Sequence, residues 1–362
     1  MRRRAIALLC LMVPAVASAT VFAQQSTTTP STPGDPIASI IDAFRTHAVV
    51  GLGEGDHNNE QGHAFRLALL RDPRFANVVN DIVVEFGNAY YQDVIDRFVG
   101  GADVPSTELR RVWQNTTQLR PVWDVPIYEE LFRAVRDLNA SLPVDRRLRV
   151  LLGDPPIDWS RVTGFADVFA QMREVGDRDT YPAKLIQREV LATGRRALVI
   201  YGDQHLTRTP ASLRPGCQPG STIPCFPGSI VDQVERSSGT RAFTITTVTG
   251  ADLRTMQSDV ATWPIPSFAR LGGTILGARS FRSFLPPGPL MIGADGRPQP
   301  EPPSVLRPIE DVYDAVLYVG PASTITYAHV SSDLCADASY VRMRRERMAM
   351  APAPEQTAIC EP

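Results

Sequence analysis

The chain of 362 residues lacks two features that would point to a membrane or to nucleic acid. No run beyond the N-terminal stretch is long and apolar enough for a transmembrane helix, and the charges nearly balance. There are 37 Lys and Arg residues against 39 Asp and Glu residues, which gives a formal net charge of −2. Without a basic excess, the chain has no electrostatic footprint for phosphate backbones or anionic lipid surfaces. We therefore expect no nucleic-acid partner and no membrane span.

Two common catalytic motifs are also missing. There is no Gly-x-Ser-x-Gly segment, which excludes the usual serine elbow of the α/β-hydrolases. His57 and His63 stand six positions apart, whereas the zinc helix of the His-Glu-x-x-His type needs histidines four apart. The glycines at 51, 53 and 55 suggest a dinucleotide turn, but Glu54 and Asp56 would repel a pyrophosphate. We therefore disfavour a nicotinamide cofactor.

Cysteine is scarce, with five in the chain. Cys10 lies in the N-terminal leader discussed next, and four cysteines remain without it. An even number in an oxidising compartment predicts two disulfides. Pairing by nearest neighbours gives Cys217–Cys225 and Cys335–Cys360, although four cysteines allow three pairings. The spacing matches no familiar cysteine-ligated metal site.

The N-terminus has the three parts of a secretory signal peptide. Three arginines are followed by an apolar stretch from Ala5 to Val16 and then by small residues. The pattern predicts a signal peptide over residues 1–23, and its apolar part is too short to span a bilayer. Residues 24–36 are rich in Ser, Thr, Gln and Pro and are expected to be a disordered lead-in. We expect a periplasmic or secreted protein.

The rest of the chain alternates between short β-rich apolar runs and longer helical patterns. Strands are predicted at 48–52, 82–86, 148–152, 197–201, 243–248 and 315–319. Helices are predicted at 58–70, 89–99, 106–118, 126–140, 164–174, 180–194 and 229–236. Strands separated by helices imply right-handed crossovers. The fold class is therefore α/β, with a mostly parallel open sheet covered by helices on both faces.

One large domain accounts for most of the chain. We assign residues 37–340 to a single α/β domain. Within it, residues 255–310 form a Pro-rich insertion with several large apolar side chains, which predicts either a flap over a site or a surface insertion. Residues 341–362 are basic and then rich in Ala and Pro, and they are expected to be a frayed C-terminal tail.

Polar residues follow four of the predicted strands in the same sense. They are Glu54 and His57 after the first, Glu85 at the end of the second, Asp154 after the third, and Asp203 and His205 after the fourth. The carboxyl ends of parallel strands lie along one edge of a sheet, where active sites form. We therefore expect carboxylates and imidazoles from separate segments to meet in one cleft.

The residue types indicate acid–base chemistry. His57 is the predicted general base that activates water, with its tautomer held by Glu54 or Glu85. His205 is predicted to act as a second acid or base or to polarise the substrate, and Glu60 to orient the helix or the substrate. Asp154, Asp203 and His63 are predicted substrate-binding residues. For two of them a structural role is open as well: His63 as a partner of Glu60, and Asp154 as a turn former before Pro155.

These motifs resemble the erythromycin esterase-like superfamily, which also includes haem-uptake lipoproteins and Tiki-type metalloproteases. The resemblance rests on Gly53-Glu54-Gly55-Asp56-His57-Asn58-Asn59-Glu60 between a strand and a helix. Further support comes from the strand that ends in Glu85, the strand that runs to His205, and the last core strand at 314–319. Where the esterases commonly have Thr-His-Gly, this chain has Asp56-His57-Asn58. The resemblance covers roughly residues 40–330.

The resemblance implies an exported hydrolase in which His and Glu assist attack of water on an ester or amide of a small-molecule or peptide substrate. One alternative is a metal-dependent protease with a divalent ion, Zn²⁺ or Mn²⁺, among Glu54, His57, Glu85 and His205. Another is a haem- or metal-binding protein without turnover. Its haem ligands would come from His57, His205, Tyr90 and Tyr91.

Overall fold

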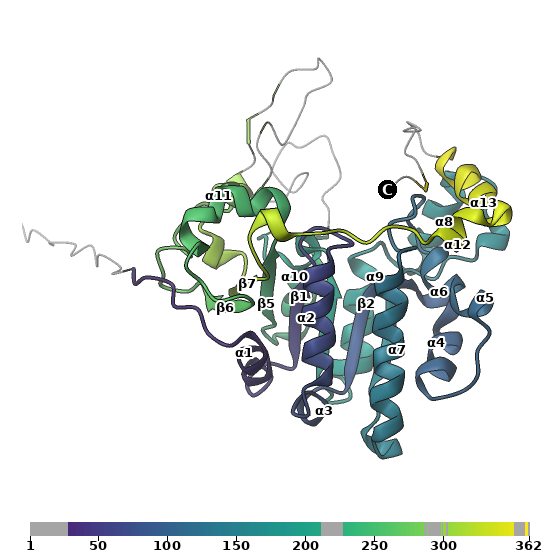
Figure 1. The fold of residues 1–362 in the computed structure, drawn as a ribbon, viewed down its shortest axis with the longest axis horizontal. Helices are drawn as coiled ribbons and strands as arrows, with labels where there is room; N and C mark the ends of the chain where they lie inside the picture. The colour runs from purple at the N-terminus through teal and green to yellow at the C-terminus, as the bar shows by residue number, and fades with distance from the viewer. Residues whose placement is uncertain are drawn as a thin grey trace, which may run out of the picture.

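The computed structural model describes residues 28–210, 227–285 and 303–350, together with positions 288, 298, 300–301 and 359–360 (Figure 1). The predicted signal peptide and the predicted pair Cys217–Cys225 lie outside these residues. The sulfurs of Cys335 and Cys360 lie 2.27 Å apart, as the nearest-neighbour pairing predicts. No helix in the described part of the chain is both long and apolar enough to cross a membrane.

Seven strands form one sheet in the order β3-β2-β4-β1-β5-β7-β6. The strands are β1 (Val49–Gly53), β2 (Asp81–Asn88), β3 (Arg149–Asp154), β4 (Ala197–Tyr201), β5 (Phe243–Val248), β6 (Ser267–Arg270) and β7 (Ala315–Tyr318). All neighbouring pairs are parallel except β6 with β7. This topology confirms the predicted α/β class with a mostly parallel sheet.

Helices cover both faces of the sheet (Figure 1). They are α1 (Pro36–Ala43), α2 (Glu60–Arg71), α3 (Phe75–Val78), α4 (Gln92–Val99), α5 (Ser106–Leu109), α6 (Arg111–Gln114), α7 (Pro126–Ser141), α8 (Phe165–Val175), α9 (Thr180–Ile186), α10 (Ile230–Ser238), α11 (Gly250–Val260), α12 (Ser332–Ala336) and α13 (Ala338–Met348). Val50 and Leu52 of β1 pack in one core with α2 and α7, whereas Val49 packs in a second core with α9 and α10. This alternation explains why the central strands are apolar throughout.

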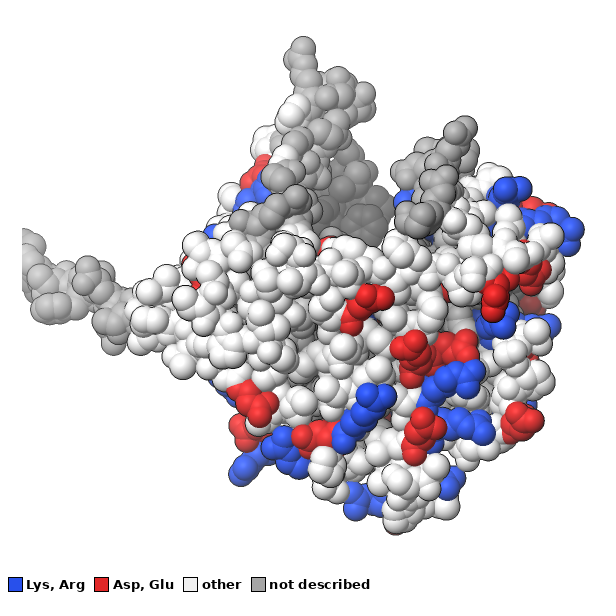
Figure 2. Space-filling model, viewed as in Figure 1, with Lys and Arg blue, Asp and Glu red and all other residues white. Residues whose placement is uncertain are grey.

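Charges of both signs are mixed on the face shown in Figure 2. Over its lower part, Lys and Arg side chains alternate with Asp and Glu side chains, and no large area carries one sign. The mixture agrees with the small net charge of the sequence. A surface of this kind gives no steering field for a polyanion.

Two predicted helices differ from the structure, and one strand was not predicted. The 106–118 helix is broken into α5 and α6, and the 180–194 helix ends at Ile186 and continues as a π-helical turn, Gln187–Leu191. Strand β6 was not predicted, because Ser267–Arg270 is short and stands between Pro266 and Gly272 within the Pro-rich insertion. Among the seven strands it pairs with β7 alone, at the edge of the sheet. A four-residue edge strand leaves little periodic signal in the sequence.

The two predicted disordered segments are partly ordered. In the lead-in, Gly34 N donates to Phe268 O at 2.8 Å, so this part of the chain runs beside β6. The predicted frayed tail begins inside α13. There, Arg344 is buried and its Nε donates to Asp124 Oδ2 at 2.6 Å, while the Tyr340 hydroxyl donates to the same oxygen at 2.6 Å. A long-range ion pair of this kind has no periodic signature, which is why composition suggested fraying.

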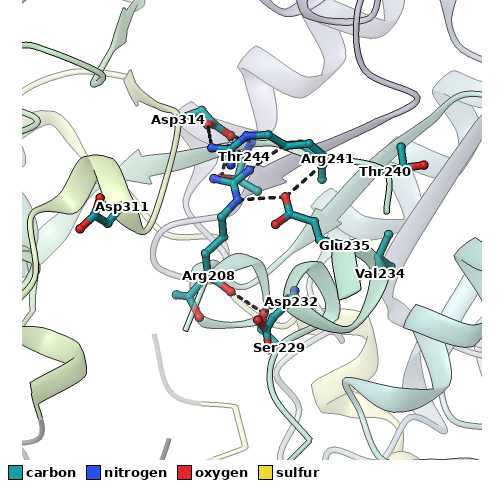
Figure 3. A network of polar contacts seen from close by, with 12 residues as sticks. Arg208, Ser229, Asp232, Val234, Glu235, Thr240, Arg241, Thr244, Asp311 and Asp314 are labelled. Carbon is teal, nitrogen blue, oxygen red and sulfur yellow. Dashed lines mark hydrogen bonds and ion pairs between the residues drawn. The ribbon is translucent and has the colours of Figure 1, made fainter. Parts of the chain in front are cut away.

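A second buried cation ties α10 to the sheet (Figure 3). The Arg208 guanidinium donates to Glu235 of α10 at 2.9 Å, to the carbonyl of Ala242 at 2.6 Å and to Asp314 at 2.7 Å. Asp314 also accepts from the backbone N of Thr244 at 2.8 Å. The contacts join α10 to the residues that begin β5 and precede β7. We call this set the Arg208 network.

Candidate active site

The turn after β1 brings Glu54 and His57 to the carboxyl edge of the sheet. Gly55 has a φ of 66°, in the left-handed region that favours glycine, and its N–H donates to Asp203 Oδ2 at 2.5 Å. The other oxygen of Asp203 accepts from the backbone N of Thr247 at 3.1 Å. A Cβ on Gly53 would lie only 2.1 Å from Asp203 Oδ1, so only glycine fits there. Asp203 therefore holds the shape of the turn.

Glu54 and His57 form a hydrogen-bonded dyad. His57 Nδ1 lies 3.0 Å from Glu54 Oε2. Glu54 is fully buried, and its other oxygen lies 3.4 Å from Arg66, while the His57 side chain is 34% exposed. A carboxylate on Nδ1 favours the tautomer with the proton on that atom, which leaves Nε2 free to accept a proton. The dyad thus has the arrangement of an oriented general base.

Aromatic packing fixes the other side of the imidazole. The buried Trp123 meets the His57 ring edge to face, with centroids 4.6 Å apart. Trp123 in turn packs against Phe86 and Tyr128. Trp123 was not among the site residues predicted from the sequence, because it lies in a loop and not at the end of a strand. It restricts the rotation of His57 through shape alone.

Glu85 joins the ends of β2 and β4. Its Oε2 accepts from the backbone N of Gly202 at 2.7 Å, and its Oε1 contacts Arg178 and lies 3.4 Å from His205 Nε2. Burial acts to raise the pKa of Glu85, but the hydrogen bond and charge of His205, together with Arg178 and His57, lower it to about 2. Glu85 is therefore a carboxylate at neutral pH and not an acid.

His205 lies between two carboxylates. Its Nδ1 is 2.8 Å from Asp179 Oδ1, and Glu85 faces its Nε2. Burial acts to lower the pKa of His205, but the hydrogen bonds and charges of Asp179 and Glu85 raise it to about 10. His205 is consequently an imidazolium at neutral pH. Like Arg178, it can stabilise negative charge, but it cannot serve as a base there.

Asp154 supports the site from behind. Its carboxylate accepts from the backbone N of Thr117 at 2.7 Å and from the Thr117 hydroxyl at 2.6 Å, and it lies 4.0 Å from Arg178. Burial raises the pKa of Asp154 to about 7, and burial likewise raises the pKa of Asp203 to about 6. Both aspartates were predicted to bind substrate, and in the structure their oxygens hold backbone groups.

A cavity of about 360 Å³ opens over these groups. Its lining includes His57, Glu85, Arg178, Asp203 and His205. The Pro-rich insertion adds Phe281, Phe284 and Leu285, so this part of the insertion does lie against the cavity. Apolar walls around a few converging charged groups are typical of a small-molecule site.

Two predicted site residues lie elsewhere. Glu60 accepts a hydrogen bond from the hydroxyl of Thr326 at 2.5 Å, and His63 Nε2 lies 3.0 Å from Glu130 Oε2. Neither residue lines the cavity, and His63 does not pair with Glu60. Two residues that the sequence did not single out, Arg178 and Asp179, reach the site instead. They belong to the loop between α8 and α9, where strand-end reasoning gives no signal.

The site also offers a candidate metal position. Among the described residues, Glu54, His57 and Glu85 place one ligand atom each within 4.8 Å of one another, and His205 is not part of this group. Carboxylate and imidazole donors suit Zn²⁺ or Mn²⁺. However, Arg66 already faces Glu54, and Arg178 and His205 already face Glu85. The carboxylates therefore have cationic partners within the protein.

Comparison with known proteins shows the fold and not an activity. No family model and no curated protein matches the chain. The solved structure of a succinoglycan biosynthesis protein is similar to this chain, with a TM-score of 0.54 and 9% sequence identity. The structure of a Bacillus cereus protein is similar with a TM-score of 0.51 and 11% sequence identity. Each comparison covers 84% of this chain and 97% of the other chain. The erythromycin esterase EreC in its open conformation gives a TM-score of 0.48 at 12% identity, over 79% and 93% of the chains. Likenesses at this level of identity show the fold alone, and the two structures with TM-scores above 0.5 agree with the α/β architecture described above.

Proposed function

We propose that this chain is an exported hydrolase of the erythromycin esterase-like superfamily that uses His57 to direct water onto an ester or amide. The observation that supports this is the Glu54–His57 dyad, which leaves Nε2 of a partly exposed imidazole at a cavity with Arg178 and His205 in its wall. A base and two cations at one cavity match the needs of acyl transfer to water. A panel of chromogenic esters and amides, assayed with the purified protein, tests this.

The mechanism follows from the charges. Nε2 of His57 takes a proton from water while the oxygen attacks the carbonyl carbon, and Glu54 stabilises the imidazolium that forms. The carbonyl oxygen becomes an oxyanion, which the positive charge of Arg178 or His205 stabilises. The intermediate then collapses, and His57 returns the proton to the leaving oxygen or nitrogen. A carboxylic acid and an alcohol or amine are released, and no covalent enzyme intermediate is needed.

The pH dependence of hydrolysis tests these protonation states. Burial acts to lower the pKa of His57, but the hydrogen bond and charge of Glu54, with Glu85, raise it above the usual 6.5. Because a base must be unprotonated, we expect kcat/KM to rise with pH through an inflection above 6.5. In Glu54→Gln the inflection should move to lower pH. An inflection that does not move in Glu54→Gln would contradict the dyad.

A metal-dependent protease is the second candidate, favoured by the clustering of Glu54, His57 and Glu85. In such a site the ion would lower the pKa of bound water. Since the carboxylates already face cations, we expect mass spectrometry to find Zn and Mn far below one equivalent. We also expect turnover to survive dialysis against a chelator. Near-stoichiometric metal in the wild type that is lost in His57→Ala would establish the metal-dependent alternative instead.

Binding of haem without turnover has weaker support. Of the predicted ligands, His57 and His205 line the cavity, but both ring nitrogens of His205 face carboxylates. The Tyr91 hydroxyl accepts from Asn115 at 2.7 Å, and neither Tyr90 nor Tyr91 lines the cavity.

The proposal that the protein is exported rests on the leader predicted at residues 1–23. N-terminal sequencing of protein recovered from the periplasm or medium tests it.

A further inference from the structure

A second cavity, of about 440 Å³, adjoins the active-site cavity. Its walls are mostly apolar and include Leu119, Val122, Phe165, Phe169, Met172 and Met348. They come from three separate parts of the chain: the loop after α6, helix α8, and the last residue of α13. We call it the apolar cavity. Its volume is within the range of small-molecule sites.

The walls of the apolar cavity are unusual for a surface. Phe169 is 47% exposed, and Phe165 meets it edge to face with centroids 4.7 Å apart. Large aromatic side chains that stay in contact with water forgo the free energy of burial. A ligand that covers Phe165 and Phe169 would recover it. Met172 and Met348 add flexible side chains that adapt to differently shaped apolar groups.

The apolar cavity and the active-site cavity share two lining residues. Gln118 and Arg178 line both cavities. The guanidinium of Arg178 pairs with Glu85. When the Gln118 amide is oriented with its oxygen toward Arg178, that oxygen accepts hydrogen bonds from the two terminal guanidinium nitrogens at 3.2 and 3.0 Å. A substrate whose carbonyl lies near Arg178 and His57 therefore has, on the other side of Arg178, an apolar space that its acyl group could fill.

We propose that the apolar cavity binds the acyl side of the substrate, so that the enzyme prefers esters or amides of medium-chain or ring-bearing apolar acids. This inference rests on the proposed hydrolase function. Each methylene moved from water into an apolar site stabilises the complex by about 0.8 kcal/mol, or roughly fourfold in affinity. An octanoyl chain offers several methylenes to such a space, whereas an acetyl group offers none.

The test compares p-nitrophenyl acetate with p-nitrophenyl octanoate. We expect kcat/KM for the octanoate to exceed that for the acetate by roughly tenfold to a hundredfold, because only part of the chain is fully buried. Phe169→Ala should lower the octanoate value about fivefold and leave the acetate value unchanged, since it removes only apolar wall. The matched control is Arg173→Ala, an exposed position of the same helix, which should change neither.

Binding of octanamide to His57→Ala, followed by calorimetry, separates the two proposals because it needs no turnover. Octanamide binding that weakens in the Phe169→Ala/His57→Ala double variant supports the apolar cavity even if no ester is hydrolysed, in which case the hydrolase proposal alone fails. Hydrolysis of acetate and octanoate at equal kcat/KM, with no octanamide binding, overturns the inference and leaves the hydrolase proposal standing.

Discussion

Replacing His57 by alanine is expected to lower kcat/KM by roughly 10²–10⁴-fold, the usual contribution of a positioned acid–base group. His57 lines the cavity, its Nδ1 is oriented by the buried Glu54, and its side chain is still partly exposed. His205 cannot replace it, because its pKa is raised to about 10 and it stays protonated. Alanine also removes the hydrogen bond to the fully buried Glu54, so the thermal midpoint is expected to fall while the protein stays folded.

The matched control for this variant is His63→Gln. His63 lies six positions further along the chain, but it contacts Glu130 and does not line the cavity. A glutamine can still donate to Glu130, so activity should stay within about twofold of the wild type. Steady-state kinetics on the best substrate of the ester panel measure both variants. Full activity in His57→Ala, or a large loss in His63→Gln, would show that the base has been assigned to the wrong histidine.

Replacing Arg208 by methionine should cost about 3 kcal/mol in the free energy of unfolding, which is near the lower end for breaking a buried ion pair. The Arg208 side chain is 10% exposed and is shared between Glu235, Asp314 and the carbonyl of Ala242 (Figure 3). Methionine fills a similar volume but donates no hydrogen bond. It leaves two carboxylates and a carbonyl without their main donor.

Urea unfolding of Arg208→Met beside Arg241→Met measures this cost. Arg241 contacts the same Asp314 at 3.0 Å, but its side chain is 60% exposed, and its loss should cost under about 1 kcal/mol. Burial acts to raise the pKa of Asp314, but Arg208 and the other donors to its carboxylate lower it in the folded protein. The stability that Asp314 contributes is therefore fully present above the pKa of the unfolded chain. It is lost as the pH falls through the lower pKa of the folded protein. The difference between the variants should therefore shrink in acid. Equal losses for both arginines at neutral pH would mean that burial does not set the cost.

The sequence predicted the parts of the site that lie at strand ends. Glu54, His57, Glu85 and His205 were predicted together because parallel strands present their carboxyl ends at one edge. Arg178 and Asp179 were missed because they lie in a loop between helices, and only the tertiary fold brings that loop to Glu85 and His205. These two residues also change the predicted chemistry. With Asp179 and Glu85 around it, His205 becomes a fixed cation instead of a second base.

Helical geometry separates the histidines that the sequence places together. His57 lies in the turn before α2 and faces the cavity, whereas His63 lies inside α2 and points to α7, where Glu130 meets it. The glycines predict a turn there, and in the structure Asn59 caps α2 by accepting from Gly62 N at 2.7 Å. It could not predict which neighbouring helix would supply a carboxylate for His63, since that depends on helix packing.

The long-range pair between Asp124 and Arg344 has a consequence for how the site is assembled in time. Asp124 follows Trp123, the aromatic wall of His57, and it is tied to α13, which lies more than two hundred positions later in the chain. A chain emerging from the ribosome therefore displays the strands that carry Glu54, Glu85 and His205 well before the segment that fixes Trp123. The aromatic packing that orients His57 is therefore complete only after α13 has docked.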